Sequence, residues 1–124
     1  MARIMIVDDA LFMRQMLSKI LIGEGHEICA EAFNAKEAVE KYKASKPDLV
    51  TMDIVMPMME ELDGIRAVKE IIKFDHRARI LLISAMSQQP IVVEAIRLGA
   101  KDFLSKPVNP ERLKETVRNI LANP

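Results

Sequence analysis

Short runs rich in apolar residues recur along the chain and alternate with segments of helical periodicity. The runs cover residues 4–7, 27–32, 49–52, 80–83 and 102–104. Most of them are continuous rather than alternating, which is typical of strands buried on both faces of a sheet. The segments between them place apolar residues at i, i+3, i+4 and i+7. Five strands alternating with five helices predict an α/β domain, a doubly wound parallel sheet covered by helices on both sides.

Capping residues support the predicted helix boundaries. Asn34 is expected to cap the second helix, and Asn109, followed by proline and glutamate, the last one. One face of the fourth helix is expected to carry Val92, Ala95, Ile96 and Gly99, and Gly99 is expected to end this helix.

Length and composition exclude several classes of protein. The chain has 124 residues, half of them hydrophobic, and 18 basic side chains balance 18 acidic ones. We expect one domain with a real core, not a disordered chain. Apolar runs stay well below the ~20 residues that span a bilayer, and zero net charge argues against nucleic-acid binding. Cys29 is the only cysteine, which predicts a buried, inert thiol and a reducing cytoplasm.

Unusual polar residues follow the predicted strands. Asp8 and Asp9 follow the first strand, Asp53 the third, Ser84 the fourth and Lys106 the fifth. In an open parallel sheet these carboxyl ends share one edge, where ligands bind. We therefore expect three carboxylates, a hydroxyl and an ammonium group in one crevice.

This combination of groups suits a metal ion and a phosphoryl group. Clustered carboxylates repel one another, and a hard cation such as Mg²⁺ relieves that repulsion. Asp53 is the best candidate for a nucleophile that forms an aspartyl phosphate, with Ser84 and Lys106 contacting the transferred oxygens. Each residue alone is more often a helix cap or part of a solvated loop, so the inference depends on the whole set. The zero net charge of the whole chain would then be the sum of an acidic pocket at this edge and basic residues elsewhere.

Several stretches carry a family resemblance. They are residues 6–9, 52–57, 83–86 and 99–107. With them the sequence resembles response-regulator receiver domains, and within that family the single-domain chemotaxis regulators, over essentially its whole length. The resemblance implies a (βα)5 flavodoxin-like fold with strand order 2-1-3-4-5. It also implies that residues 1–124 form one receiver domain without an effector domain.

The resemblance assigns roles to the acidic residues. Asp53 resembles the phosphoacceptor, while Asp8 and Asp9 resemble residues that hold Mg²⁺ together with Asp53. Val55 would add its backbone carbonyl to the metal site.

The family resemblance also implies a conformational switch. Ser84 and Phe103 resemble the residues that move together on phosphorylation, although Phe103 can equally be a plain core aromatic. Lys106 resembles the lysine that pairs with the phosphoryl group, and the bond from Lys106 to Pro107 the family's cis peptide. The fourth helix, the fifth strand and the fifth helix would form the output surface, which binds the partner protein. Four charged residues are candidates for this surface: Arg97, Lys101, Arg112 and Lys114.

One segment departs from the family pattern. Residues 56–64 are longer than usual, and the extra acids of the Met58–Asp63 loop could alter Mg²⁺ affinity or partner docking. We favour the simpler interpretation that Glu60, Glu61 and Asp63 are solvated and begin the third helix.

The expected protein is a cytoplasmic, monomeric, Mg²⁺-dependent phosphoacceptor without nucleic-acid or membrane partners. A CheA-like histidine kinase would be its phosphodonor. Its output partner would be a flagellar or archaellar motor switch protein or an adaptor protein. Two alternatives stay open: a small Mg²⁺ phosphohydrolase, and a stand-alone receiver of a non-chemotaxis phosphorelay. The hydrolase would want a second aspartate where this chain has Val55.

Overall fold

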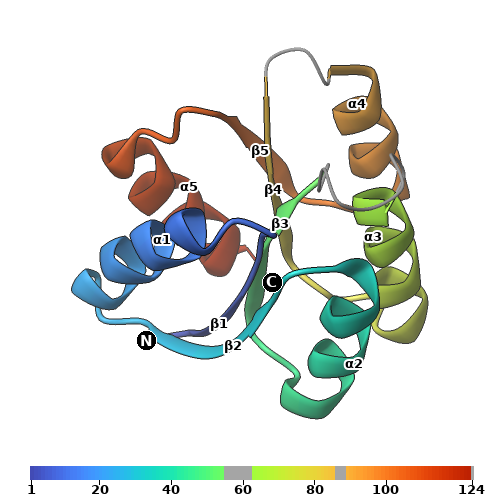
Figure 1. The fold of residues 1–124 in the computed structure, drawn as a ribbon, viewed down its shortest axis with the longest axis horizontal. Helices are drawn as coiled ribbons and strands as arrows, with labels where there is room; N and C mark the ends of the chain where they lie inside the picture. Colours follow the sequence, from blue (N-terminus) through green and yellow to red (C-terminus); the bar gives the residue numbers. More distant parts are fainter. Residues whose placement is uncertain (55–62, 86–88, 124) are drawn as a thin grey trace.

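Strands and helices alternate through the chain (Figure 1). The computed structural model describes residues 1–54, 63–85 and 89–123. The strands are β1 (Arg3–Val7), β2 (Glu27–Ala32), β3 (Leu49–Asp53), β4 (Ile80–Ser84) and β5 (Asp102–Ser105). The helices are α1 (Leu11–Gly23), α2 (Ala35–Ser45), α3 (Asp63–Phe74), α4 (Gln89–Leu98) and α5 (Pro110–Ala122). The predicted succession of elements is confirmed.

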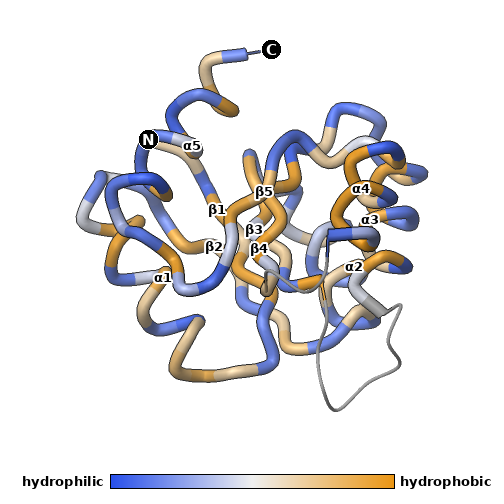
Figure 2. Tube along the Cα trace, turned by 90° about the horizontal axis from the view of Figure 1, so that it is seen from above, coloured by the Kyte–Doolittle hydropathy of each residue, from blue (hydrophilic) through white to orange (hydrophobic). Residues whose placement is uncertain are grey.

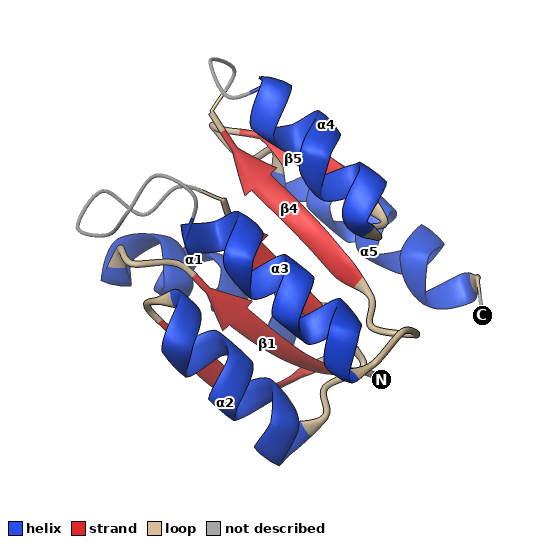
Figure 3. Ribbon diagram, turned by 90° about the vertical axis from the view of Figure 1, so that its right-hand side faces the viewer, coloured by secondary structure: helices blue, strands red, loops and turns tan. Residues whose placement is uncertain are grey.

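The strands form one parallel sheet in the order β2-β1-β3-β4-β5. Helices α2, α3 and α4 cover one face, and α1 and α5 cover the other (Figure 3). This is the doubly wound (βα)5 arrangement expected from the sequence. The strand order reverses direction between β1 and β3, so the carboxyl ends of these two central strands border the crevice where ligands bind in such sheets.

Two hydrophobic cores lie on opposite sides of the sheet, which explains the continuous apolar runs. Successive side chains of a strand point to opposite faces. In β1, Met5 and Val7 join the core beneath α2, α3 and α4, whereas Ile4 and Ile6 join the core beneath α1 and α5. Figure 2 shows the resulting concentration of hydrophobic residues in the strands. Successive positions of a central strand are therefore mostly apolar, with Thr51 of β3 as a buried polar exception.

The predicted caps are present. The side chain of Asn34 accepts a hydrogen bond from the backbone N–H of Glu37 at 2.7 Å, and that of Asn109 from Arg112 at 3.1 Å. Gly99 ends α4 with a φ of +127°, a conformation that side chains with a Cβ rarely adopt. These local signals set the start of α2 and α5 and the end of α4.

The burial prediction for Cys29 was wrong. Cys29 is only partly buried, because β2 is the edge strand and pairs on one side alone. Burial still raises the pKa of the Cys29 thiol, so it stays protonated and unreactive at neutral pH. On the apolar face predicted for α4, Val92 and Ala95 are buried, whereas 39% of the surface of Ile96 is exposed. The face of α4 that meets the sheet is narrower than its sequence pattern suggests.

The helices of the described segments are too short or too polar to cross a membrane.

Candidate functional site

Three aspartates meet at the carboxyl edge of the sheet. Asp53 ends β3, while Asp8 and Asp9 follow β1, the neighbouring strand. The two strands pair with Val7 opposite Met52, so the next residue of each, Asp8 and Asp53, reaches the same edge. One carboxylate oxygen from each of the three aspartates lies within 4.8 Å of the others. The expected acidic cluster is therefore present.

Two of these carboxylates are almost inaccessible to solvent. Asp8 is 1% exposed and Asp53 is 3% exposed. Burial, aided by the negative charge of Asp8, raises the pKa of Asp53 to about 7. Burial also raises the pKa of Asp8, against the opposing effect of a hydrogen bond from the backbone N–H of Ala10. The fold thus places the carboxyl groups of Asp8 and Asp53 in an environment that solvates negative charge poorly.

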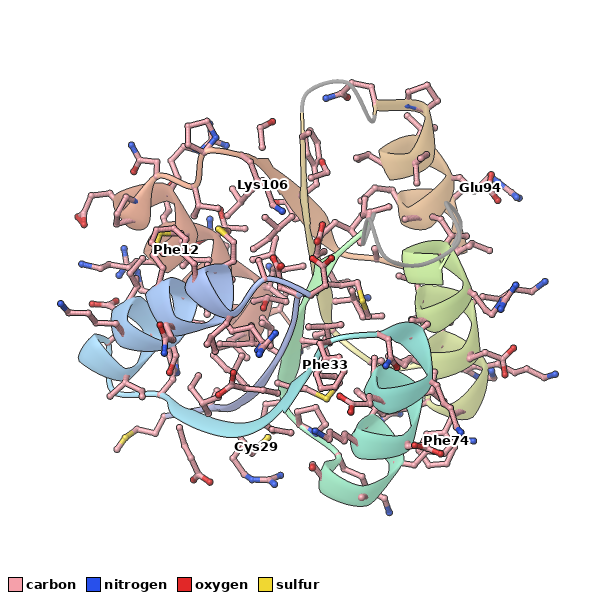
Figure 4. The ribbon with its side chains drawn as sticks, viewed as in Figure 1. Phe12, Cys29, Phe33, Phe74, Glu94 and Lys106 are labelled. Atoms are coloured by element: carbon pink, nitrogen blue, oxygen red, sulfur yellow. The ribbon has the colours of Figure 1, made fainter. Side chains whose placement is uncertain are left out.

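Lys106 supplies the positive charge of the site. Its Nζ lies 3.5 Å from Oδ1 of Asp53 and 3.7 Å from Oδ2 of Asp8. The side chain extends from the end of β5 toward the middle of the sheet (Figure 4). Its backbone N–H donates to the carbonyl of Ser84 at 2.7 Å, and its peptide bond to Pro107 is cis, the geometry that the resemblance implies. One ammonium group therefore faces two buried carboxylates.

Ser84 reaches the same edge from β4, which lies beside β3. The residue is 1% exposed, and its hydroxyl oxygen has no hydrogen-bond partner among the described residues. The Oδ2 atom of Asp8 likewise lacks a hydrogen-bond partner there. Buried polar atoms are normally paired, so unpaired ones at a site point to a missing ligand.

The donor set fits a hard divalent cation. Only carboxylate oxygens form the cluster of Asp8, Asp9 and Asp53, and oxygen ligands suit Mg²⁺. Oδ2 of Asp8 is buried without a hydrogen-bond partner among the described residues, as a ligand atom would be before the ion binds. Val55 lies outside the described residues, so its carbonyl cannot be placed, and the same holds for 58–62 of the lengthened loop.

Arg14 on α1 also contacts this edge of the sheet, and the sequence patterns did not predict its role. Its Nη1 donates to the backbone carbonyl of Asp8 at 2.7 Å, and its Nε pairs with Oε1 of Glu31 at 3.0 Å. The guanidinium carbon also lies 5.9 Å from the ring centroid of Phe33. Glu31 and Phe33 belong to β2 and the turn after it, so only the folded chain brings these partners to Arg14.

The predicted output residues do not all share one surface. Phe103 is half-buried and packs against the core on the α4 side of the sheet. Arg97 pairs with Glu94 on α4 at 2.5 Å, and Lys114 pairs with Glu111 on α5 at 3.1 Å. Arg112 borders a hollow of about 380 Å³ beside β5, together with Phe103.

Lys101 lies elsewhere. It precedes β5, at the opposite edge of the sheet from Asp53, and borders a different hollow with residues of the α3–β4 turn. The structure therefore separates Lys101 from the residues that follow the carboxyl ends of the strands.

Comparisons with known proteins agree with this geometry. Residues 4–118 match the family model of the response regulator receiver domain. The chain is 54% identical to the chemotaxis protein CheY of Thermotoga maritima, covering 95% of this chain and 96% of the relative. It is 55% identical to CheY of Bacillus subtilis, covering 96% and 97%.

A solved structure has the same fold. The CheX-CheY-BeF3-Mg²⁺ complex of Borrelia burgdorferi contains a chain with a TM-score of 0.87 and 37% identity, covering 95% of this chain and 87% of that one. The protein described here belongs to the response regulator receiver domain family and closely matches the CheY chemotaxis regulators.

Proposed function

We propose that this protein is a Mg²⁺-dependent phosphoacceptor in which Asp53 receives a phosphoryl group from a histidine kinase. The observation that carries the proposal is the meeting of four groups at one edge: the carboxylates of Asp8, Asp9 and Asp53, and the ammonium group of Lys106. A carboxylate oxygen of Asp53 would attack the phosphorus atom of phosphohistidine, forming a P–O bond as the P–N bond breaks.

The acidic cluster explains why a metal is needed. With its pKa raised to about 7, a large share of Asp53 is protonated at neutral pH and is a poor nucleophile. Bound Mg²⁺ would favour the ionised carboxylate and neutralise phosphoryl oxygens. Asp8, Asp9 and Asp53 would hold the ion.

Lys106 and Ser84 would bind the transferred group. The ammonium group of Lys106 already lies near Asp53, so it can pair with a phosphoryl oxygen after a small movement. The Ser84 hydroxyl has no partner among the described residues and can donate to another phosphoryl oxygen. Phosphorylation would thus give the buried hydroxyl a hydrogen bond that it lacks in this state.

The output would use the surface of α4, β5 and α5. Val93 and Ile96 expose 65% and 39% of their area on α4, and Phe103 borders the hollow beside β5. We propose that Ser84 and Phe103 move together on phosphorylation and reshape this surface for a motor switch or adaptor protein. The similarity to CheY chemotaxis regulators supports this class of partner. We further propose that the chain acts as a monomeric, single receiver domain and not as an enzyme with a separate substrate.

Phosphorylation of the purified protein tests this function. We expect acetyl phosphate and Mg²⁺ to give an acid-stable, base-labile acyl phosphate, and a CheA-like kinase to give the same product faster. The substitution Asp53→Asn should abolish the acyl phosphate. The matched substitution Asp102→Asn, at an exposed position of β5, should not. Equal incorporation in Asp53→Asn, or steady turnover of phosphate monoesters, would contradict the proposal.

A further inference from the structure

A basic hollow lies at the edge of the sheet opposite Asp53. Its volume is about 620 Å³, and it is lined by His76, Arg77, Arg79, Lys101 and Asn123. These residues come from the α3–β4 turn, the start of β5 and the residue after α5. The end of α5, near the label C in Figure 3, lies at this edge, far from the arrowheads of the strands. The hollow is therefore separate from the phosphoacceptor site.

The described residues that line this hollow carry positive charge and no negative charge. Among the described residues, Arg77, Arg79 and Lys101 form no side-chain ion pair. In a chain whose formal charges sum to zero, three permanent cations without ion-pair partners form a local positive field.

Two acids lie near the hollow. Asp75 accepts a 2.7 Å hydrogen bond from the hydroxyl of Tyr42 through Oδ2, and one from the backbone N–H of Arg77 through Oδ1. The hydrogen bond from Tyr42, with a smaller effect from the charge of Arg77, lowers the pKa of Asp75, so this carboxylate offsets part of the positive charge. Asp102 borders an adjoining hollow of about 200 Å³ that shares Lys101 and Asn123, and its Oδ1 accepts from the N–H of Phe103. Neither carboxylate lines the basic hollow itself.

The backbone beneath the cations is held in place. The backbone carbonyl of Arg79 accepts a hydrogen bond from the N–H of Val50 at 2.8 Å. The backbone N–H of Lys101 donates a hydrogen bond to the carbonyl of Ile80 at 2.9 Å. The N–H of Ala78 donates to the carbonyl of Asp75 at 3.0 Å and closes the turn that carries His76 and Arg77. Ordered backbone lowers the entropic cost of placing several cations around one ligand.

We propose that this hollow binds a small anion with two or more linked phosphate groups. Guanidinium groups match phosphate oxygens in a bidentate manner, and a lysine adds a mobile point charge. The volume falls within the usual range for small-molecule sites, about 300–1,000 Å³. Apart from the imidazole of His76, none of the described residues that line the hollow has an aromatic or aliphatic side chain, so they offer little stacking surface for a nucleobase and no apolar contact for a partner helix. The phosphate groups themselves are what the site recognises.

Calorimetry with pyrophosphate and tripolyphosphate tests the site. Mg²⁺ is omitted, because it would favour phosphate binding at Asp53. We expect one saturable site that binds tripolyphosphate more tightly than inorganic phosphate and weakens as salt rises. Amide NMR shifts should centre on residues 76–79 and 101. Shifts centred on Asp53 and Ser84, or no saturable binding, would overturn the proposal.

Two double variants separate local recognition from net charge. Arg77→Gln with Lys101→Gln removes two exposed cations of the hollow, and we expect affinity to fall about tenfold or more. Lys19→Gln with Lys36→Gln removes the same charge from exposed helix positions and should leave affinity within about twofold. Equal losses in both variants would overturn the proposal, as would tighter binding of a polyglutamate peptide than of tripolyphosphate. Phosphorylation of Asp53 should be normal in the first variant, which keeps this test independent of the proposed function.

Discussion

The Nζ atom of Lys106 lies 3.5 Å from Oδ1 of Asp53, with only 3% of Asp53 exposed to solvent. This ammonium group opposes the effects that raise the pKa of Asp53, which are burial and the charges of Asp8 and Asp9. The ion pair thus keeps part of the nucleophile ionised before any metal binds.

Replacing Lys106 should raise the pKa of Asp53 further. In Lys106→Gln the carboxylate keeps its burial and its acidic neighbour but loses the cation that lowers its pKa. Carbon-detected NMR titration of the Asp53 carboxyl group should give a value above about 7 without Mg²⁺. Lys114→Gln, which removes a cation paired with Glu111 on α5, is the control and should leave the titration unchanged. A lower pKa in Lys106→Gln would show that the ion pair does not form in solution.

Stability without divalent cations should fall as the pH rises from about 4 to 7. Asp53 has a pKa of about 7 in the folded state, above its ordinary value of 3.8, so the folded state binds the extra proton in this window. The unfolding free energy therefore decreases with pH, by up to about 4 kcal/mol for a difference of about three pH units. Urea titrations at several pH values measure this slope.

Two comparisons check the origin of that slope. Asp53→Asn removes one titrating group, so the slope should become shallower, with a remainder from Asp8, whose pKa burial also raises, and the variant should be more stable than the parent at pH 8. Added Mg²⁺ should stabilise the parent protein at pH 8, because it binds the ionised cluster of the folded state. An unchanged slope in Asp53→Asn would assign the titration to another group.

Gly64 should tolerate no side chain. A Cβ built there would overlap the backbone carbonyl of Ile54, the residue directly after Asp53. Gly64→Ala must therefore displace either the start of α3 or the end of β3. We expect a loss of about 1–3 kcal/mol in unfolding free energy and slower phosphorylation by acetyl phosphate.

Gly23→Ala is the matched control for that substitution. A Cβ at Gly23, in the last turn of α1, would meet no atom within 4 Å. The stability should be unchanged or should rise by about 0.4–1 kcal/mol, because alanine restricts the unfolded chain. Equal effects of the two substitutions would exclude the contact with Ile54 as the cause.

Thr51→Val should stabilise the protein. Thr51 is 1% exposed in the middle of β3, and its hydroxyl has no hydrogen-bond partner among the described residues. Valine has nearly the same shape and removes the unsatisfied group, which should add about 1 kcal/mol in urea unfolding. Thr51→Ser keeps the hydroxyl and removes the methyl group, so it should lower stability instead. A destabilised Thr51→Val protein would show that the hydroxyl finds a partner in solution.

Local sequence signals were sufficient for the succession of elements and for the edge at which the acids gather. Apolar runs mark strands, helical spacing marks helices, and Asn34 and Asn109 mark helix starts, because each signal depends on neighbours within a few residues. Parallel strands also bring their carboxyl ends to one side, so Asp8, Asp53 and Ser84 could be grouped without coordinates.

The tertiary structure alone decided how those groups are solvated and which other residues approach them. The raised pKa of Asp53 depends on its burial beside Asp8 and Lys106, and the support from Arg14 depends on Glu31 and Phe33. The partial exposure of Cys29 depends on β2 being an edge strand. The sequence determined which residues lie at the end of each element. Burial and charge pairing depend on contacts between distant segments, and these exist only once the sheet has assembled.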